Sequence, residues 1–329
     1  MTITLRRRSL LGATLTATLT AALAAPALAQ GYPSRPVRLI VPYPPGGATD
    51  ITARLLAQEL SSSLGQPFAV ENRGGGASVT GTQAIAAATP DGHALGVIDT
   101  AFVVNPGLLG SRLPYDTRRD FSFVSVLVRS PLVLVVPASA PWQDLAALVR
   151  DARAKPNELT FGSAGNGTAV HMAGEQFRLA ADFSFLHVPY RGGGPMITDV
   201  LAGRVHMAFG TIPAMAEHVR AGRLRALAIT GDTRASLLPE VPTMAEAGFP
   251  AVDAALLNAL IGPAGLPEPV LAQLAAASRR AVTSPAMTAR LTQLGFEPVG
   301  GTPAEAAALL LAQITQWDRV IRDGDIKVD

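Results

Sequence analysis

Three glycine-rich loops hold the residues of this sequence that are best suited to bind an anion. They read PPGGATD at 44–50, NRGGGASVTG at 72–81 and GSAGNGT at 162–168. Each is expected to follow a strand and precede a helix, where backbone N–H groups and the helix dipole attract negative charge. Short side chains add further donors: Ser78, Thr80, Ser163, Asn166 and Thr168. Such loops also occur where a chain only turns and caps a helix, so both interpretations stay open.

Known catalytic and cofactor motifs do not fit these loops. None ends in the Gly-Lys-Ser/Thr of a P-loop, and GNGTAV lacks the third glycine of a dinucleotide fingerprint. Ser163 lies in TFGSAG, without the glycine two residues earlier that a nucleophile elbow needs. The five histidines lack the H-E-x-x-H spacing, and we expect no carboxylate partner for them at helix spacing. We therefore expect no metal, no cofactor and no catalysis; a hydrolase using Ser163 and His171 is the weakest alternative.

Three further polar residues lie beside the loops. Asp50 either caps the first expected helix or faces a ligand, where its carboxylate would accept from a hydroxyl or an amine. Tyr43 and Tyr190 end strands in the similar stretches VPYPPGG and VPYRGGG. Because the carboxyl ends of strands border the ligand crevice in open α/β sheets, we favour both tyrosines as its walls over buried packing.

The elements that must position these loops alternate between strands and helices. We expect a first strand at 37–43, followed by a helix that ends at Gly65, a glycine suited to a C-terminal cap. A second series contains a strand at 132–136 and helices at 142–154, 168–180 and 196–202. Both series repeat strand, glycine loop and helix without a fixed sequence period. This pattern predicts two doubly wound α/β domains with mainly parallel sheets around a ligand cleft.

The end of the chain is also expected to be helical. Thr302 is placed as an N-cap, with Pro303 at the first helical position and Glu305 suited to a capping box. Apolar residues then recur at steps of four, three and four: Leu310, Ile314, Trp317 and Ile321. We expect this stripe to pack against a sheet, with a role for Trp317 in ligand stacking as the lesser alternative.

The first 29 residues have the pattern of an export signal. A basic start is followed by an Ala/Leu/Thr stretch, and Ala27-Leu28-Ala29 supplies a cleavage pattern after Ala29. Arg7-Arg8 also allows twin-arginine export, although we favour an ordinary signal, and a membrane anchor is a further alternative. The segment is short and rich in threonine, which argues against an anchor. The sequence thus predicts a periplasmic protein.

Composition narrows the choice of partners. The chain has 27 Lys and Arg residues against 25 Asp and Glu, and removal of Arg6, Arg7 and Arg8 with the signal leaves 24 against 25, or −1. This balance gives no support for a nucleic-acid or lipid-surface partner. The chain has no cysteine, which excludes disulfides, thiol nucleophiles and cysteine-held zinc. Without coiled-coil heptads or a long exposed apolar stripe, we expect a monomer.

An ordered set of stretches resembles the extracytoplasmic solute receptors of tripartite tricarboxylate transporters, often called the Bug family. The set includes RLIVPYPPGGATDITARLLAQELS, FAVENRGGGASVTG, LTFGSAGNGTAVHMAGEQF, HVPYRGGGPMITDVLAGRVHMAF and WDRVIRDGDIKVD. The resemblance implies a periplasmic binding protein, type II-like, which closes around a small carboxylate and delivers it to integral membrane transporter subunits. After the signal peptide predicted at 1–29, it implies domain 1 at 31–130 plus 251–329 and domain 2 at 131–250. A ligand sensor for a signalling partner is the main alternative function.

The resemblance also indicates which residues hold the ligand. It implies a first group in domain 1: Tyr43, Pro44, Gly46, Gly47, Asp50, Gly76, Ala77 and Ser78. It implies a second group in domain 2: Ser163, Asn166, Gly167, Thr168, His171 and Tyr190. Asp99 is unusual for the family, and a carboxylate facing the ligand would repel a second anionic group. We therefore expect a ligand with one carboxylate and a neutral or cationic remainder; its identity stays open.

Overall fold

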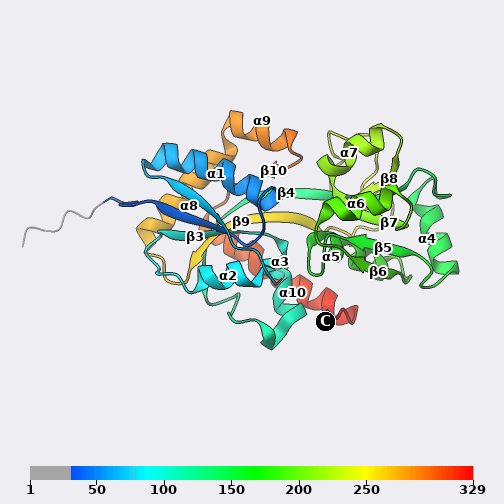
Figure 1. Ribbon diagram of the computed structural model, residues 1–329, viewed down its shortest axis with the longest axis horizontal. Coiled ribbons are helices and arrows are strands. Elements are labelled where there is room, and N and C mark those ends of the chain that lie inside the picture. The colour runs from blue at the N-terminus through cyan, green and yellow to red at the C-terminus, as the bar shows by residue number, and fades with distance from the viewer. Residues whose placement is uncertain (1–30, 77, 329) are drawn as a thin grey trace, which may run out of the picture.

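The computed structural model describes residues 31–76 and 78–328. The predicted signal peptide with its cleavage site, and Ala77, lie outside the described residues. Figure 1 shows two groups of elements side by side, which we call the first and second lobes. No helix within the described ranges combines the length and the apolar character that crossing a membrane requires.

The first lobe contains a sheet in which three strands run parallel. Its strands are β1 (Val37–Val41), β2 (Phe68–Asn72), β3 (Ala94–Ile98), β9 (Ala255–Pro263), β10 (Glu297–Pro298) and the first part of β4 (Phe121–Pro137). Its helices are α1 (Ala48–Leu64), α2 (Val79–Ala86), α3 (Thr100–Leu109), α8 (Glu268–Thr283), α9 (Pro285–Gln293) and α10 (Pro303–Asp323), with a short 3-10 helix at Gly110–Arg112. β1 pairs in parallel with β2 and β3, while β9 lies antiparallel between β3 and β4.

The second lobe repeats this plan with shorter elements. Its strands are β5 (Thr160–Ser163), β6 (Leu186–Pro189), β7 (Met207–Thr211), β8 (Leu224–Ile229) and the second part of β4. Its helices are α4 (Leu145–Ala154), α5 (Ala169–Ala180), α6 (Gly193–Leu201) and α7 (Ile212–Arg220). β5 pairs in parallel with β6 and β7. The strand path through both lobes is β2-β1-β3-β9-β4-β7-β5-β6, with β8 and β10 also paired to β4.

One long strand joins the lobes. β4 pairs with β9 up to Pro131, and from Leu132 onward it pairs with β7 and β8. The expected strand at 132–136 was therefore too short, because β4 continues for 17 residues. Two serines interrupt the apolar run of β4, and their hydroxyls bond to backbone carbonyls far away in the chain. Ser130 donates to Gly295 O at 2.8 Å, and Ser125 donates to Gly301 O at 3.0 Å. The change of partners lies beside the predicted domain boundary, and the division itself stays a prediction.

Local sequence signals were reliable at several helix ends. Gly65 adopts the left-handed conformation (φ 73°) that closes α1, and Thr302 with Glu305 forms the expected capping box of α10. Trp317 is 1% exposed and packs in the core with the other three residues of the α10 stripe. Two helix starts differ from the expectation. α4 begins at Leu145, after Asp144 caps it by accepting from Ala147 N, and α6 begins at Gly193.

Candidate functional site

Parallel pairing brings the first two glycine loops to one edge of the first lobe. β1, β2 and β3 point the same way, so the loops that follow them share that edge. A Cβ placed on Gly74 would lie 3.2 Å from Cδ of Pro44, so the loops touch. A Cβ on Gly81 would lie 2.7 Å from both Pro42 and the carbonyl of Arg73, which requires glycine there. The first two glycine loops therefore lie against each other at this edge.

Asp50 fixes the shape of the first loop. It is the third residue of α1, and its carboxylate accepts from Gly46 N at 2.9 Å, Asn72 Nδ2 at 2.8 Å and Arg54 Nε at 2.9 Å. Burial opposes ionisation, but the hydrogen bonds from Arg54, Gly46 and Asn72 outweigh it and lower the pKa of Asp50. Asp50 therefore links the first loop to α1 and to β2, a role close to the helix capping that the sequence suggested. A ligand contact for Asp50 stays a prediction.

At the edge where the first two glycine loops lie, the helix starts of α1 and α2 lack side-chain caps. Gly47, the N-cap of α1, supplies no cap, and a Cβ on Gly46 or Gly47 would meet nothing within 4 Å. Ser78, the N-cap of α2, makes no capping hydrogen bond either. In α2, Val79 N already donates to Gly76 O at 3.0 Å and Thr80 N to Gly75 O at 3.5 Å, so its first turn is largely occupied. The N–H groups of a first helical turn have no intrahelical partner, so the start of α1 can donate to an anion.

Ser78 is unusual in conformation as well as in contacts. Its φ of 72° lies in the left-handed region, which residues other than glycine rarely occupy. It is 3% exposed, and its hydroxyl lies near that of Tyr43 but makes no hydrogen bond of good geometry in the part of the chain that the structure describes. Backbone strain and a buried unpaired polar group both cost free energy, and both are characteristic of binding sites.

Asp99 forms a buried pair with Tyr43 beside these loops. The Tyr43 hydroxyl donates to Oδ1 of Asp99 at 2.7 Å, and the same oxygen accepts from Ala101 N at 3.0 Å as the N-cap of α3. Desolvation raises the pKa of Asp99 to about 6, and desolvation together with Asp99 raises the pKa of Tyr43. Both side chains nevertheless keep partial exposure.

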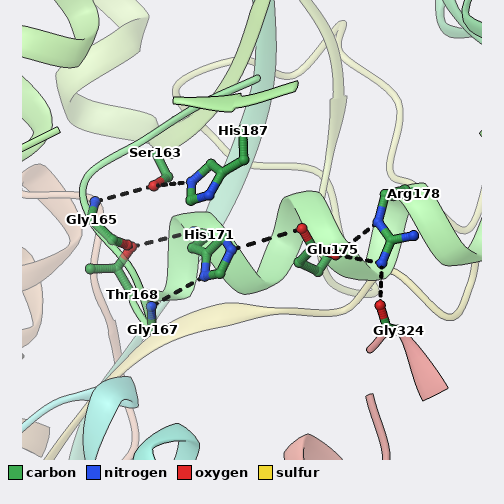
Figure 2. A network of polar contacts seen from close by, with 9 residues as sticks. All are labelled: Ser163, Gly165, Gly167, Thr168, His171, Glu175, Arg178, His187 and Gly324. Carbon is green, nitrogen blue, oxygen red and sulfur yellow. Dashed lines mark hydrogen bonds and ion pairs between the residues drawn. The ribbon is translucent and has the colours of Figure 1, made fainter. Parts of the chain in front are cut away.

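In the second lobe, the loop at 165–168 satisfies many of its own polar groups (Figure 2). Thr168 caps α5 by accepting from His171 N at 3.3 Å, and its hydroxyl donates to Gly165 O at 2.7 Å. Gly165 N donates to Ser163 Oγ at 3.2 Å, and Gly167 N donates to His171 Nδ1 at 3.2 Å. Two N–H groups that this loop was expected to offer are thus already used. Asn166 remains exposed on the loop.

Ser163 and His171 lie beneath the loop, and a second histidine joins them. Ser163 is fully buried, and its Oγ lies 2.7 Å from Nε2 of His187 on β6. The rings of His171 and His187 stack with centroids 4.2 Å apart and an interplanar angle of 11°. Desolvation lowers the pKa of His171 to about 3 and that of His187 to about 4, so both rings are neutral. Among the described residues, the histidine that contacts Ser163 is His187, whereas the sequence suggested His171.

Sequence inspection missed three residues of this cluster. We expected no carboxylate at helix spacing from any histidine; this was wrong, because Glu175 Oε1 lies 3.8 Å from His171 Nε2, one turn along α5. The H-x-x-x-E spacing could have revealed it. Arg178 pairs with Glu175 at 2.8 Å, and His187 reaches Ser163 only through the register of β5 and β6. Within the described ranges, no group of three or more His, Cys, Asp or Glu side chains is placed to hold a metal.

The second-lobe loop contacts the first lobe. Gly167 has φ +73°, and a Cβ placed on it would lie 3.1 Å from Leu108 Cδ1 and 3.4 Å from Asn105 Oδ1, both on α3. Tyr190 lies on the other side of the loop, where its carbonyl is 3.2 Å from a Cβ placed on Gly165. The Tyr190 hydroxyl donates to Asp199 Oδ2 at 2.7 Å. Gly167 therefore lies at the junction with α3, while the other expected site residues, and all contacts with a ligand, stay predictions.

Comparison with known proteins assigns the family. Residues 52–326 match the family described as tripartite tricarboxylate transporter family receptor. The chain belongs to this receptor family. BugT of Bordetella pertussis is 37% identical to this receptor over 307 residues, which cover 93% of this chain and 94% of BugT. The family resemblance seen in the sequence is thereby confirmed.

Solved structures agree with the fold of this receptor. A protein of R. palustris solved with adipate superposes with a TM-score of 0.82 at 33% identity, covering 90% of this chain and 99% of that one. MatC from Rhodopseudomonas palustris with bound malate gives a TM-score of 0.78 at 30% identity, covering 88% of this chain and 100% of MatC. The predicted fold, two α/β lobes of the periplasmic binding protein type, is confirmed.

Proposed function

We propose that this receptor is exported to the periplasm, binds a small carboxylate between its lobes and delivers it to a membrane transporter of the tripartite tricarboxylate type. The family assignment supports a solute-binding role. Two related structures were solved with adipate and malate, and both of these ligands are carboxylates. The proposal includes a signal peptide at 1–29, a domain at 31–130 plus 251–329, a domain at 131–250, and a monomeric receptor without catalysis.

One observation carries the proposal: the buried hydroxyl of Ser78, which makes no hydrogen bond of good geometry within the described residues, lies at the same sheet edge as the uncapped start of α1. An unsatisfied buried polar group costs about 1–3 kcal/mol, and a ligand oxygen would remove this cost. The first turn of α1 adds N–H donors at this edge. A carboxylate fits this set because it only accepts hydrogen bonds and carries the charge that helix starts favour.

The two lobes have different tasks in this proposal. The first lobe offers open donors, so it binds the carboxylate before closure. The second lobe, whose loop N–H groups at Gly165 and Gly167 are occupied, closes over the ligand with Asn166, Thr168 and Tyr190. β4 and the chain entering β9 connect the lobes and provide the hinge. Ligand contacts made by both lobes exist only in the closed form, so binding shifts the population toward it.

Asp99 limits the class of ligand. Its pKa of about 6 keeps it ionised at neutral pH, and its side chain is partly exposed beside the loops. A second anionic group on the ligand would meet this charge in a poorly solvated place, which is unfavourable. We therefore propose a ligand with one carboxylate and a neutral or cationic remainder.

The test uses purified protein comprising residues 30–329 in thermal unfolding and calorimetry. The ligands are amino acids, aromatic acids and aliphatic mono-, di- and tricarboxylates, including adipate and malate. A true ligand at 100 times its dissociation constant adds about 2.7 kcal/mol to the free energy of unfolding. Stabilisation by monocarboxylates supports both parts of the proposal. Stabilisation by dicarboxylates alone contradicts the Asp99 argument, and no binding to any carboxylate, after removal of carried-over ligand by refolding, contradicts the binding role.

A further inference from the structure

We propose that Glu175 and Arg178 are positioning residues that set the ligand loop at 165–168 through the ring of His171. The inference rests on the proposed function, because it concerns the loop that closes over the ligand. Neither residue is expected to touch the ligand itself. Figure 2 shows the series of contacts, which runs from the loop along α5 to the end of α10.

The first step is the tautomer of His171. Gly167 N donates to its Nδ1 at 3.2 Å, so Nδ1 must carry a lone pair. The ring is 2% exposed and neutral, so its single proton lies on Nε2. The opposite tautomer would place an N–H against the N–H of Gly167. The observed loop conformation, with Gly167 N turned inward, therefore needs this tautomer.

The second step is the charge that favours the tautomer. Glu175 Oε1 lies 3.8 Å from His171 Nε2, which is too long for a hydrogen bond, so the carboxylate acts on the ring proton through its charge. Arg178 holds the other carboxylate oxygen, with Nε donating to Oε2 at 2.8 Å. Oε1 is thereby left facing the imidazole. A proton on Nε2 is favoured by this neighbour, and one on Nδ1 is not.

The third step ties this arrangement to the other lobe. Arg178 Nη2 also donates to the carbonyl of Gly324, the C-cap of α10, at 2.9 Å. α10 packs against α3, and α3 carries Leu108, which faces Gly167. The loop thus meets the first lobe at its tip and, through α5, at its base. The position of Arg178 fixes the carboxylate of Glu175 relative to the first lobe as well as to α5.

If Glu175 and Arg178 had a purely structural role, they would stabilise α5 without affecting the tautomer of His171. The chain offers a control for that role: Arg153 Nε donates to the carbonyl of Ala181, the C-cap of α5, at 2.7 Å. This contact also joins an arginine to a helix end, but it does not involve Glu175 or the loop. Arg153→Gln therefore reports what is lost when only the end of α5 is loosened.

The experiment combines nitrogen NMR of the histidine rings with ligand titration. In the wild-type receptor at pH 7, His171 should show the neutral Nε2–H tautomer. Glu175→Gln and Arg178→Gln should give a mixture of tautomers and weaken binding of a carboxylate found in the panel by about tenfold. Arg178→Lys, which keeps a cation beside Glu175, should restore most of the tautomer preference. Arg153→Gln should leave the tautomer and the affinity unchanged.

Several results would overturn the inference. A wild-type His171 with its proton on Nδ1, or a charged ring at pH 7, contradicts it without any variant, so it can be tested even if a substitution prevents folding. Glu175→Gln with wild-type tautomer and affinity also contradicts it. If the wild-type receptor binds no carboxylate, the proposed function fails, while the tautomer measurement still decides the positioning claim.

Discussion

A single carboxylate oxygen joins Tyr43 to Asp99. Oδ1 of Asp99 accepts the hydroxyl of Tyr43 at 2.7 Å and the N–H of Ala101 at 3.0 Å, so it connects the end of β1 to the start of α3. The pair therefore fixes the relative positions of the first glycine loop and the helix that meets the second lobe. It does so with a group whose pKa is raised to about 6, which makes the connection sensitive to pH.

Asp99→Asn should stabilise the receptor at neutral pH. Because its pKa is raised, the folded state holds the Asp99 proton more tightly than the unfolded chain does. The contribution of protonated Asp99 to the free energy of unfolding is therefore complete below about pH 4 and is lost as pH rises through 6. The mutant should therefore gain up to about 3 kcal/mol over wild type between pH 4 and 7.5. Asparagine still accepts from Tyr43 and Ala101. Urea unfolding at several pH values measures the difference, and a constant difference would contradict the assignment.

Ser78→Gly should make the empty receptor more stable but bind its ligand less well. Glycine removes the strain of φ 72°, worth about 1 kcal/mol, together with the hydroxyl that is proposed to contact the carboxylate. Ser78→Ala removes only the hydroxyl. Ser278 on α8 provides a control, because its hydroxyl is likewise buried and makes no hydrogen bond of good geometry among the described residues. Calorimetric titration should show weaker binding for both Ser78 variants, whereas equal losses in Ser278→Ala would exclude a local effect.

Gly167→Ala should weaken ligand binding through the junction of the lobes. The added methyl would lie 3.1 Å from Leu108 and so press the loop away from α3. Gly222→Ala is the matched control, because Gly222 has a similar φ of +66° but nothing within 4 Å of the added Cβ. Both variants should lose about 1–2 kcal/mol of unfolding free energy from left-handed strain. Only the first should lose affinity, and Leu108→Ala in the same chain should restore part of it.

Asp50→Asn should destabilise the receptor by about 2 kcal/mol at neutral pH, because three donors converge on its buried carboxylate. The pKa of Asp50 is lowered, so this contribution is present above the ordinary Asp value and disappears as pH falls through the lower folded value. Arg54→Ala should cost less, since the Arg54 side chain is 53% exposed. Denaturant unfolding at pH 7 and pH 3 tests both. An equal loss at the two pH values would show that the charge is irrelevant.

The features that could be predicted from the sequence depend on residues close together in the chain. The cap at Gly65, the capping box of α10 and the stripe around Trp317 all involve steps of one helical turn. The glycine loops were also correctly placed between strands and helices, because strand and helix periodicities differ on either side of them. Glu175 belongs to the same local class, and its H-x-x-x-E spacing was simply overlooked.

The features that could not be predicted depend on pairing across the sheet. β4 was cut short because Ser125 and Ser130 interrupt its apolar run, and only carbonyls about 170 residues away satisfy them. His187 approaches Ser163 through strand register, which has no sequence signature. α3 was not expected, since Pro106 lies inside it and its pattern is nearly uniformly apolar. Its N-cap, Asp99, was therefore assigned to the ligand alone and not also to a helix start.

The position of β9 sets the order in which the molecule can assemble. β9 lies between β3 and β4 and pairs Ile261 with Gly96, so the sheet of the first lobe stays divided until residues 255–263 are available. All of the second lobe is synthesised before that point. Contacts this distant in sequence form slowly because a long loop must close first. The first lobe, although it begins the chain, is therefore expected to be the last to become native, and β3 must wait with an unpaired edge until then.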